Sequence, residues 1–354
     1  MGRYYFAVFI PGFALAPLAG VLADRLDRKR IALVCAAAVA LLAALLSGLT
    51  AAGRITPGLV LWLGFLLGTA YTFASPASHA IVANAVPRED LGSAISLQSA
   101  LNNLTRVGGP LLAAPLLAAR RFEAGFALYA VAALAAALLV ALVRIRPYAP
   151  DGGAAGILGR VRDGMVHARE RRPALPALGL VAALSLFGVS HVALLPTFAG
   201  EVLGRMDLFP WLVAATGLGA LVGALATGYR SPSLRTAALQ LALYGLALAA
   251  FAAAPGAAFA LGAQLVVGYF YFCVMTGLQT LIQDVVAEPR RGRVMSLFHV
   301  AWGGLVPFGG LAMGELAGRA GSATAIALGA AACVACGVLS ALVARDFTRE
   351  GPEA

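Results

Sequence analysis

Eleven long apolar runs constrain the fold of this chain more than any other feature of its 354 residues. Each run is about 20 residues long, and an α-helix of that length spans the hydrocarbon core of a bilayer. Backbone polar groups find no water there and must be paired within the segment, which requires a helix. The sequence therefore predicts an all-α integral membrane protein. The predicted spans are 4–23, 31–52, 57–85, 92–118, 122–143, 175–199, 209–229, 235–254, 257–286, 293–317 and 322–344.

Composition agrees with this prediction. Hydrophobic residues make up 61% of the chain, charged residues 12%, and the mean hydropathy is +0.87, whereas a soluble domain is roughly 45–50% apolar. The formal net charge of +10 could by itself indicate a nucleic-acid partner. The basic residues, however, lie mostly in the loops between the apolar runs. We therefore expect the lipid bilayer, and no nucleic acid, as the large partner of this chain.

The distribution of the 26 Lys and Arg residues predicts an orientation. Most of them lie in alternate loops, beginning with loop 24–30, and cytoplasmic loops are the ones that collect basic residues. Loop 24–30 is therefore predicted to be cytoplasmic, with the N-terminus outside and the C-terminus in the cytoplasm. The expected location is the cytoplasmic (inner) membrane of a bacterium, which the chain crosses many times.

One long polar connection, 144–174, divides five spans from six. We expect an N-terminal bundle at 1–143, a basic cytoplasmic linker at 144–174, a C-terminal bundle at 175–346 and a tail at 347–354. Part of the linker could form a basic amphipathic helix on the anionic leaflet, or the whole linker could be simply solvated.

Two stretches of the chain repeat each other at a spacing of about 200 residues, as in transporters built from two helical bundles. Pro87–Leu97 and Pro289–Leu297 are both charged loops that enter a span. Each of these spans contains a glycine pair, Gly108-Gly109 in the first copy and Gly309-Gly310 in the second. The repeat favours two related halves.

The loop between the first two spans has a specific pattern of small and charged residues, Gly20, Asp24, Arg25, Arg28 and Arg30. A carboxylate at position 24 can cap the positive N-terminus of a neighbouring helix. The arginines can pair with acids or with helix C-termini. If such contacts form only when the two halves close on this side, the loop acts as a gate. The alternative is a basic cluster that only sets topology.

Polar residues inside the span 92–118 are the best candidates for contact with a solute. Asn102, Asn103 and Arg106 lie well inside this apolar run, and an ionisable residue in a membrane helix usually faces a cavity or a partner. Gly108-Gly109-Pro110 follows directly and predicts close helix approach and a bend. In the alternative interpretation Arg106 has a purely structural partner.

Further solute-facing candidates are spread over other spans. The three histidines in or near spans are His79, His191 and His299, and each could relay protons; His191 is the best placed, in the middle of a span. A packed histidine is the alternative at each position. The remaining candidates, which could line a cavity for an amphipathic solute, are Tyr71, Gln264, Tyr269, Phe270, Tyr271, Gln279 and Trp302. In the second half, Arg291, Gly292 and Arg293 form a second charged loop.

These motifs resemble the major facilitator superfamily of transporters. The loop from Gly20 to Arg30 is similar to the signature loop between the second and third helices of that family. The segment Arg291-Gly292-Arg293-Val294-Met295-Ser296 resembles its enterobactin-exporter-like branch, which includes siderophore and macrolide efflux proteins. The resemblance implies two helical bundles that rock about a central site, with protons as the coupling ion. It also implies that the first helix of the family, where this branch has an acidic residue, is missing, so that eleven spans divide as five and six.

Several classes of function are not indicated. No phosphate-binding loop, metal-ligand cluster or acid/base pair is present in the sequence, so we expect neither an enzyme nor a cofactor or metal. Cys333-x-x-Cys336 has redox spacing, but two small packing residues are the simpler interpretation. The leading hypothesis is a monomeric secondary transporter that exports a small amphipathic compound, a siderophore or a drug. The alternatives are a non-transporting, truncated or receptor-like membrane protein and a membrane-embedded enzyme.

Overall fold

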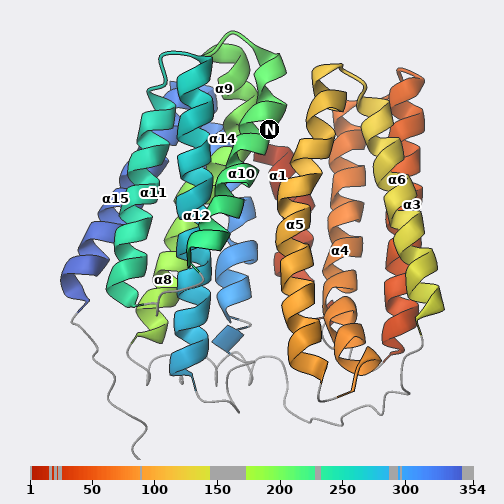
Figure 1. Cartoon of the computed structure of the whole chain (residues 1–354). Coiled ribbons are helices and arrows are strands. Elements are labelled where there is room, and N and C mark those ends of the chain that lie inside the picture. The colour runs from red at the N-terminus through yellow and green to blue at the C-terminus, as the bar shows by residue number, and fades with distance from the viewer. Residues whose placement is uncertain are drawn as a thin grey trace, which may run out of the picture. The chain divides into compact units, whose positions relative to one another are not determined.

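The computed structural model describes residues 2–15, 18–19, 22, 26–87, 90–143, 173–227, 233–286, 294–295 and 297–344. These residues are helical almost throughout, and no strand occurs among them (Figure 1). The chain divides into two compact units, one formed by 3–154 and the other by 155–354 together with residues 1–2. The predicted all-α membrane architecture is confirmed.

Long helices form both units. In the first unit they are α1 (Gly2–Ala14), α3 (Arg28–Ala51), α4 (Pro57–Ala85), α5 (Leu91–Ala118) and α6 (Phe122–Leu142). In the second unit the elements are α8 (Ala174–Ala183), η2 (Leu184–Gly188), η3 (Val189–Leu194), α9 (Leu195–Glu201), η4 (Met206–Leu208), α10 (Phe209–Thr227), α11 (Leu234–Ala252), α12 (Ala257–Val285), η5 (Val300–Gly304), α14 (Val306–Ala320) and α15 (Ser322–Val343).

Nine stretches of the described chain are long and apolar enough to cross a membrane. They correspond to nine of the eleven predicted spans. The other two predictions coincide with α1, whose continuous helix has 13 residues, and with α5, which includes the polar positions 102, 103 and 106. All eleven predicted spans thus overlap helix.

Side-chain caps fix where several helices begin. Thr56 precedes α4 and its Oγ1 accepts a hydrogen bond from the Leu59 amide at 3.3 Å, with Pro57 in the first helical turn. Ser233 does the same for α11, accepting from the Thr236 amide at 3.1 Å. Each cap satisfies a backbone donor that has no partner within the helix. Short polar turns therefore separate long apolar helices at defined residues.

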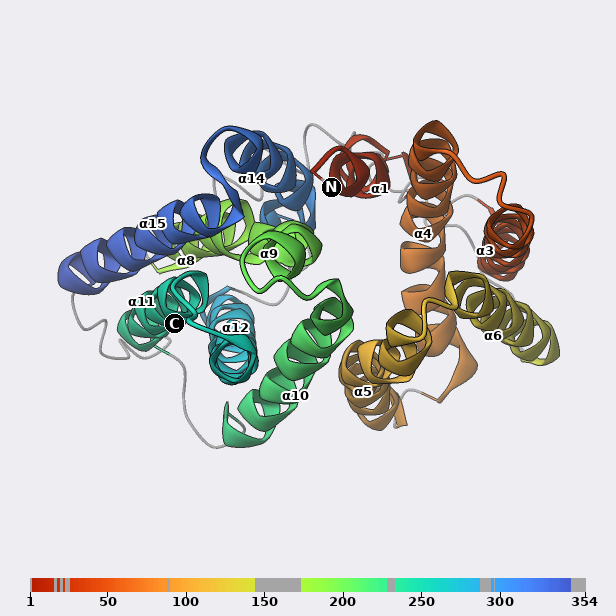
Figure 2. The ribbon, with the colours of Figure 1, turned by 90° about the horizontal axis from the view of Figure 1, so that it is seen from above.

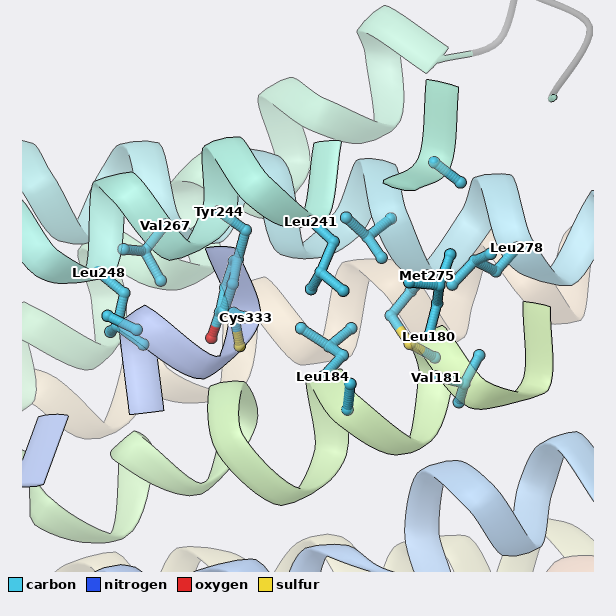
Figure 3. Close-up of a cluster of buried hydrophobic side chains, with 14 of the residues drawn as sticks. Leu180, Val181, Leu184, Leu241, Tyr244, Leu248, Val267, Met275, Leu278 and Cys333 are labelled. Atoms are coloured by element: carbon cyan, nitrogen blue, oxygen red, sulfur yellow. The ribbon is translucent and has the colours of Figure 1, made fainter. Parts of the chain in front are cut away.

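The core of the second unit lies among α8, α11, α12 and α15 (Figure 3). Within it Leu184, Leu241, Leu248 and Tyr244 are fully buried. Large apolar side chains also cover the outside of the helices; Leu142, for example, is 78% exposed. A helix that is apolar on every face suits a lipid environment, so this outer surface is the one that contacts acyl chains.

Glycines set the closest approach of helices in both units. Seen from above, α10 lies beside α12, and α11 beside α15 (Figure 2). A Cβ added to Gly219 would collide with the Leu265 carbonyl of α12, and one added to Gly268 would collide with the Thr216 carbonyl of α10. In the first unit Gly68 of α4 meets the Val8 carbonyl of α1 in the same way. In lipid the hydrophobic effect does not drive helices together, and close packing at small residues contributes to their association instead.

Gly268→Val is expected to destabilise the second unit by about 1–3 kcal/mol, since a side chain there overpacks a backbone contact. Thermal unfolding of the detergent-solubilised protein, followed with a thiol-reactive dye that labels the buried Cys273 and Cys333, measures the change. Gly262→Val is the matched control on the same helix, because its Cβ would meet no described atom within 4 Å. Equal melting temperatures for the two variants would contradict the packing role of Gly268.

Candidate transport site

The first helical span of the second unit is broken in its middle. After Ala183 the hydrogen bonding changes to a π-helical segment, η2, and then to a 3-10 segment, η3, before α-helix resumes at Leu195. A second π-helical segment, η5, packs against η2. Such segments are rare and occur often at functional sites, and discontinuous helices form the sites of many secondary transporters.

Glycines of two neighbouring helices cover the irregular backbone of this span. A Cβ on Gly309 of α14 would collide with the Leu186 carbonyl and the Ser190 hydroxyl, and one on Gly329 of α15 would lie 2.5 Å from the Phe187 carbonyl. Non-helical backbone at membrane depth is tolerated only where protein or a water-filled cavity surrounds it. The two glycines therefore allow the break to exist.

A buried polar group, His191, lies at the broken segment. Its side chain is 2% exposed, and Nδ1 lies 2.7 Å from the Gly188 carbonyl oxygen. The Tyr244 hydroxyl of α11 approaches the same nitrogen at 3.4 Å, and the Phe251 ring lies edge-on with centroids 6.3 Å apart. Gly188 makes room for this arrangement, because a Cβ there would lie 2.7 Å from the Tyr244 ring.

A second polar pair, Gln264 of α12 and Thr216 of α10, lies next to the histidine. Gln264 is fully buried, and the Thr216 hydroxyl lies 3.2 Å from its Oε1 and 3.0 Å from the Leu212 carbonyl. The Gln264 side chain also interacts with the His191 ring, although Nε2 of each residue makes no hydrogen bond among the described residues. Elements from four parts of the unit thus converge on one polar cluster, which consists of His191, Thr216, Tyr244 and Gln264.

Most of the predicted solute-facing residues lie outside this polar cluster. Tyr71 is 72% exposed on α4, whereas Tyr271 and Trp302 are half-buried and pack against the core of the second unit. Gln279 is half-buried on α12. Of the predicted candidates, His191 and Gln264 belong to the polar cluster.

Predicted residues of α5 are described in part. The helix includes the backbone of Asn102, Asn103 and Arg106, but their side chains lie outside the described residues. A Cβ on Gly108 or Gly109 would meet no described atom within 4 Å. The α5 helix is assigned as one element through Gly108-Gly109-Pro110.

In the charged part of the predicted gating loop, the described residues begin at residue 26. Gly20, Asp24 and Arg25 lie outside the described residues, as do Arg291, Gly292 and Arg293 of the second charged loop. Arg28 is the first residue of α3 and is half-buried, and Arg30 is exposed and lies 3.6 Å from Asp27. Asp27 caps α3 by accepting from the amides of Lys29 and Arg30. The acid at this position therefore starts the helix.

Lys29 forms an unpredicted contact in the first unit. Its Nζ donates to the Ala141 carbonyl at 2.8 Å and to the Val143 carbonyl at 2.7 Å, at the end of α6. A cation at a helix C-terminus satisfies unpaired carbonyls and complements the helix dipole. At the opposite end of the same two helices the Ser47 hydroxyl donates to the Glu123 carbonyl at 2.9 Å. The two helices α3 and α6 are therefore joined at both ends.

Sequence reasoning missed Thr216 and Tyr244 as members of a polar cluster, and it missed Lys29. The available signals were weak: Lys29 is the only lysine of the chain, and Gln264 interrupts an apolar run. The partners that define the cluster and the Lys29 contact lie on other helices, where sequence spacing does not reveal them.

Membrane-length helices around a broken span with buried polar side chains define a multi-pass transporter fold. Residues 4–308 match the family model described as the Major Facilitator Superfamily. The chain belongs to this superfamily.

Relatives and solved structures agree with the family. An uncharacterized MFS-type transporter, y4rN of Sinorhizobium fredii, is 28% identical over 310 residues, covering 84% of this chain and 74% of the relative. Macrolide efflux protein A of Streptococcus pyogenes is 26% identical over 315 residues, covering 82% and 73%. The solved nucleoside transporter NupG superposes with a TM-score of 0.72 at 13% identity, covering 96% of this chain and 88% of NupG. The xylose transporter XylE of E. coli, in an inward-open conformation, gives a TM-score of 0.70 at 16% identity, covering 96% and 84%.

Lys29→Gln is expected to destabilise the protein by about 1 kcal/mol, because a cation at the end of α6 is lost. The thermal unfolding assay with the thiol-reactive dye detects this as a lower melting temperature. Arg30→Gln is the matched control: this side chain is exposed and pairs only weakly with Asp27. A Lys29 variant that melts together with the control would show that the contact is not stabilising.

Proposed function

We propose that this chain is a secondary active exporter of a small amphipathic compound and that a proton gradient drives the export. The observation on which the proposal mainly rests is the similarity to macrolide efflux protein A over 82% of the chain. That relative's name, which states macrolide efflux, supports the proposed direction of transport and the proposed substrate class. Siderophore export, which the second charged loop suggests, is the alternative substrate within the same class.

The two compact units are suited to alternating access. In this mechanism two helical bundles rock about a site near the middle of the membrane, and each unit here has its own packed helices. We assign the bundles to 1–143 and 175–346, the linker to 144–174 and the tail to 347–354. The proposed setting is the bacterial inner membrane, with the C-terminus cytoplasmic and the protein acting as a monomer.

Residues of α5 are the proposed contacts for the solute. Positions 102 and 103 of α5 lie four and three residues before Arg106, the spacings of neighbouring positions on a helix surface. A guanidinium and two carboxamides can bind the hydroxyl, carbonyl or carboxylate oxygens of an amphipathic compound. The apolar remainder of the compound would then contact neighbouring helices.

The loop that precedes α3 is the proposed gate. Gly20, Asp24 and Arg25 would form contacts that stabilise the state closed toward the cytoplasm, with Arg28 and Arg30 at the start of α3. Arg291, Gly292 and Arg293 would form the matching loop of the second half.

Arg106→Ala is expected to abolish most of the export, since the only basic group inside α5 is lost. Accumulation of a radiolabelled macrolide is measured in a bacterial strain that lacks its own efflux pumps and expresses the protein. Wild-type protein lowers accumulation, whereas the variant does not. Arg54→Ala, an exposed residue outside the spans, is the matched control, and the amount of each protein in the membrane is measured with a C-terminal tag.

Other outcomes of this experiment would decide between functions. Binding of the labelled macrolide without any change in accumulation or exchange would favour a receptor-like protein. Increased accumulation would reverse the proposed direction. Full activity of the Arg106 variant would make Arg106 a structural residue.

Asp24→Asn is expected to slow export several-fold while leaving membrane insertion unchanged, because the proposed gate loses its carboxylate. The same accumulation assay measures the effect. Asp207→Asn is the control, since this acid lies in another connecting segment and pairs with Arg205 at 2.7 Å on the exposed surface. If both variants export at the wild-type rate, the proposed gating role of Asp24 is wrong.

A further inference from the structure

The polar cluster around His191 contains a titratable group to which the proposed mechanism has assigned no role. Its imidazole is almost completely buried, so a bulky solute does not contact it in this structure. We propose that His191 binds the proton that drives transport, and that the Gln264 amide reverses its orientation when the proton binds. The inference rests on the proposed function, because it supplies proton-driven export with a proton-binding residue.

The hydrogen bond to Gly188 determines where a further proton can bind. A backbone carbonyl only accepts, so Nδ1 of His191, 2.7 Å from the Gly188 oxygen, must carry the hydrogen of the neutral ring. The lone pair then lies on Nε2. This nitrogen is buried and has no partner among the described residues. It is therefore the site for the second proton, and protonation leaves the bond to Gly188 intact.

The Gln264 amide has two hydrogen-bonding arrangements. With Oε1 toward Thr216, both this oxygen and the Leu212 carbonyl compete for the single hydroxyl hydrogen. With the amide reversed, its nitrogen donates to the Thr216 hydroxyl, which keeps its bond to Leu212. The two arrangements place the same heavy atoms in the same positions. They differ in what the amide presents to the histidine.

Each arrangement matches one charge state of the histidine. Neutral His191 has a lone pair on Nε2, and the amide N–H₂ group can face it. Protonated His191 has an N–H at Nε2 and needs an acceptor, which is the amide oxygen of the reversed Gln264. Binding of the proton and reversal of the amide are therefore linked, and the Thr216 hydroxyl receives a donor as a result.

The surroundings of His191 favour its neutral form in the structure as described. The titratable group facing it is Tyr244 of α11, and Cys333 of α15 lies beside that tyrosine (Figure 3). The α14 helix approaches this region through Gly309, and α12 approaches it through Gln264. The charged residues of α14, Glu315 and Arg319, are exposed and form an ion pair with each other. None of the hydrogen-bonding or ring partners of His191 in the described part of the chain is charged.

A positive charge without a counter-ion is unfavourable in such a site. Proton binding must then be accompanied by rearrangement that admits water or a negative group. The adjoining π-helical and 3-10 segments have poorer hydrogen-bond geometry than α-helix, so they are the parts of the span that can rearrange at least cost. The cycle takes one proton from the outside onto Nε2 and releases it to the cytoplasm, while the solute moves outward.

Measuring proton-driven transport and proton-independent exchange separately tests the role of His191 apart from the proposed function. In everted membrane vesicles, uptake of radiolabelled macrolide is driven by an imposed pH gradient, and exchange of labelled for unlabelled macrolide needs no gradient. His191→Asn retains a carboxamide that can donate to Gly188 but cannot be protonated. We expect driven uptake by this variant to fall to the level seen without a gradient, with exchange preserved. Asp207→Asn, which removes an exposed titratable group paired with Arg205 on the surface, is the control and keeps driven uptake.

Gln264→Met tests the amide. This substitution removes the amide oxygen that would accept a hydrogen bond from the protonated ring. The affinity of His191 for the proton is therefore expected to fall. The pH at which driven uptake is half-maximal should therefore move to lower values, whereas a purely structural role would change the rate at every pH alike.

A measurement without substrate keeps the inference independent of the macrolide. Hydrogen–deuterium exchange of segment 184–194 is compared at about pH 4 and about pH 7.5, a range that extends well below the ordinary histidine pKa of about 6.5, after correction for the intrinsic rate. Exchange in the wild type should increase at the lower pH, and the increase should be absent in His191→Asn.

The outcomes divide as follows. No macrolide transport by the wild type, together with exchange of segment 184–194 that depends on pH through His191, would refute the proposed substrate and support the proton site. Driven uptake by His191→Asn at the wild-type level would overturn the proton site and leave the exporter standing. A pH response of the segment that is the same in both proteins would also overturn it.

Discussion

The need to pair every backbone polar group inside the bilayer governs this structure. Regular helices meet it within each span. The span that begins with α8 is less regular, because its hydrogen-bond pattern changes at Leu184 and again at Val189. Gly309 and Gly329 let two neighbouring helices lie directly against the carbonyls of Leu186 and Phe187 in this irregular part. The break therefore depends on residues more than 100 positions further along the chain.

The polar cluster is a consequence of that break. Gly188 ends the π-helical segment, and its carbonyl holds the His191 ring in one tautomer. On the other side, the glycine-mediated contact of α10 with α12 brings Thr216 to Gln264. Backbone irregularity and small residues thus position polar groups that no single helix could bring together. The proposed transport mechanism uses this combination: a rigid outer set of helices around one span with adjustable hydrogen bonding.

Hydropathy and length predicted the helices well because both reflect the thickness of the bilayer. The span predicted at 122–143 is observed as Phe122–Leu142, and that at 257–286 as Ala257–Val285. The break within the span predicted at 175–199 was not foreseen, since its sequence is as apolar as that of a regular helix. Gly188, and Pro196 in the first turn of α9, were the available signals.

Partnerships across helices were the least predictable feature. His191 could be named from its mid-span position, but its partners Tyr244 and Gln264 lie 53 and 73 positions away, on other helices. The roles of the loop before α3 stay predictions, because Gly20, Asp24 and Arg25 lie outside the described residues. Its arginines were expected to pair with acids or with helix C-termini, whereas Lys29 makes the observed contact with the end of α6.

The Lys29 contact links two parts of the chain that lie more than 100 positions apart in the sequence. It joins the first turn of α3, directly after the signature loop, to Val143, the last described residue before the connection to the second half of the chain. The contact therefore holds the last described residues of the N-terminal helices against the first turn of α3. Lys29 thereby fixes the point at which the chain leaves these helices.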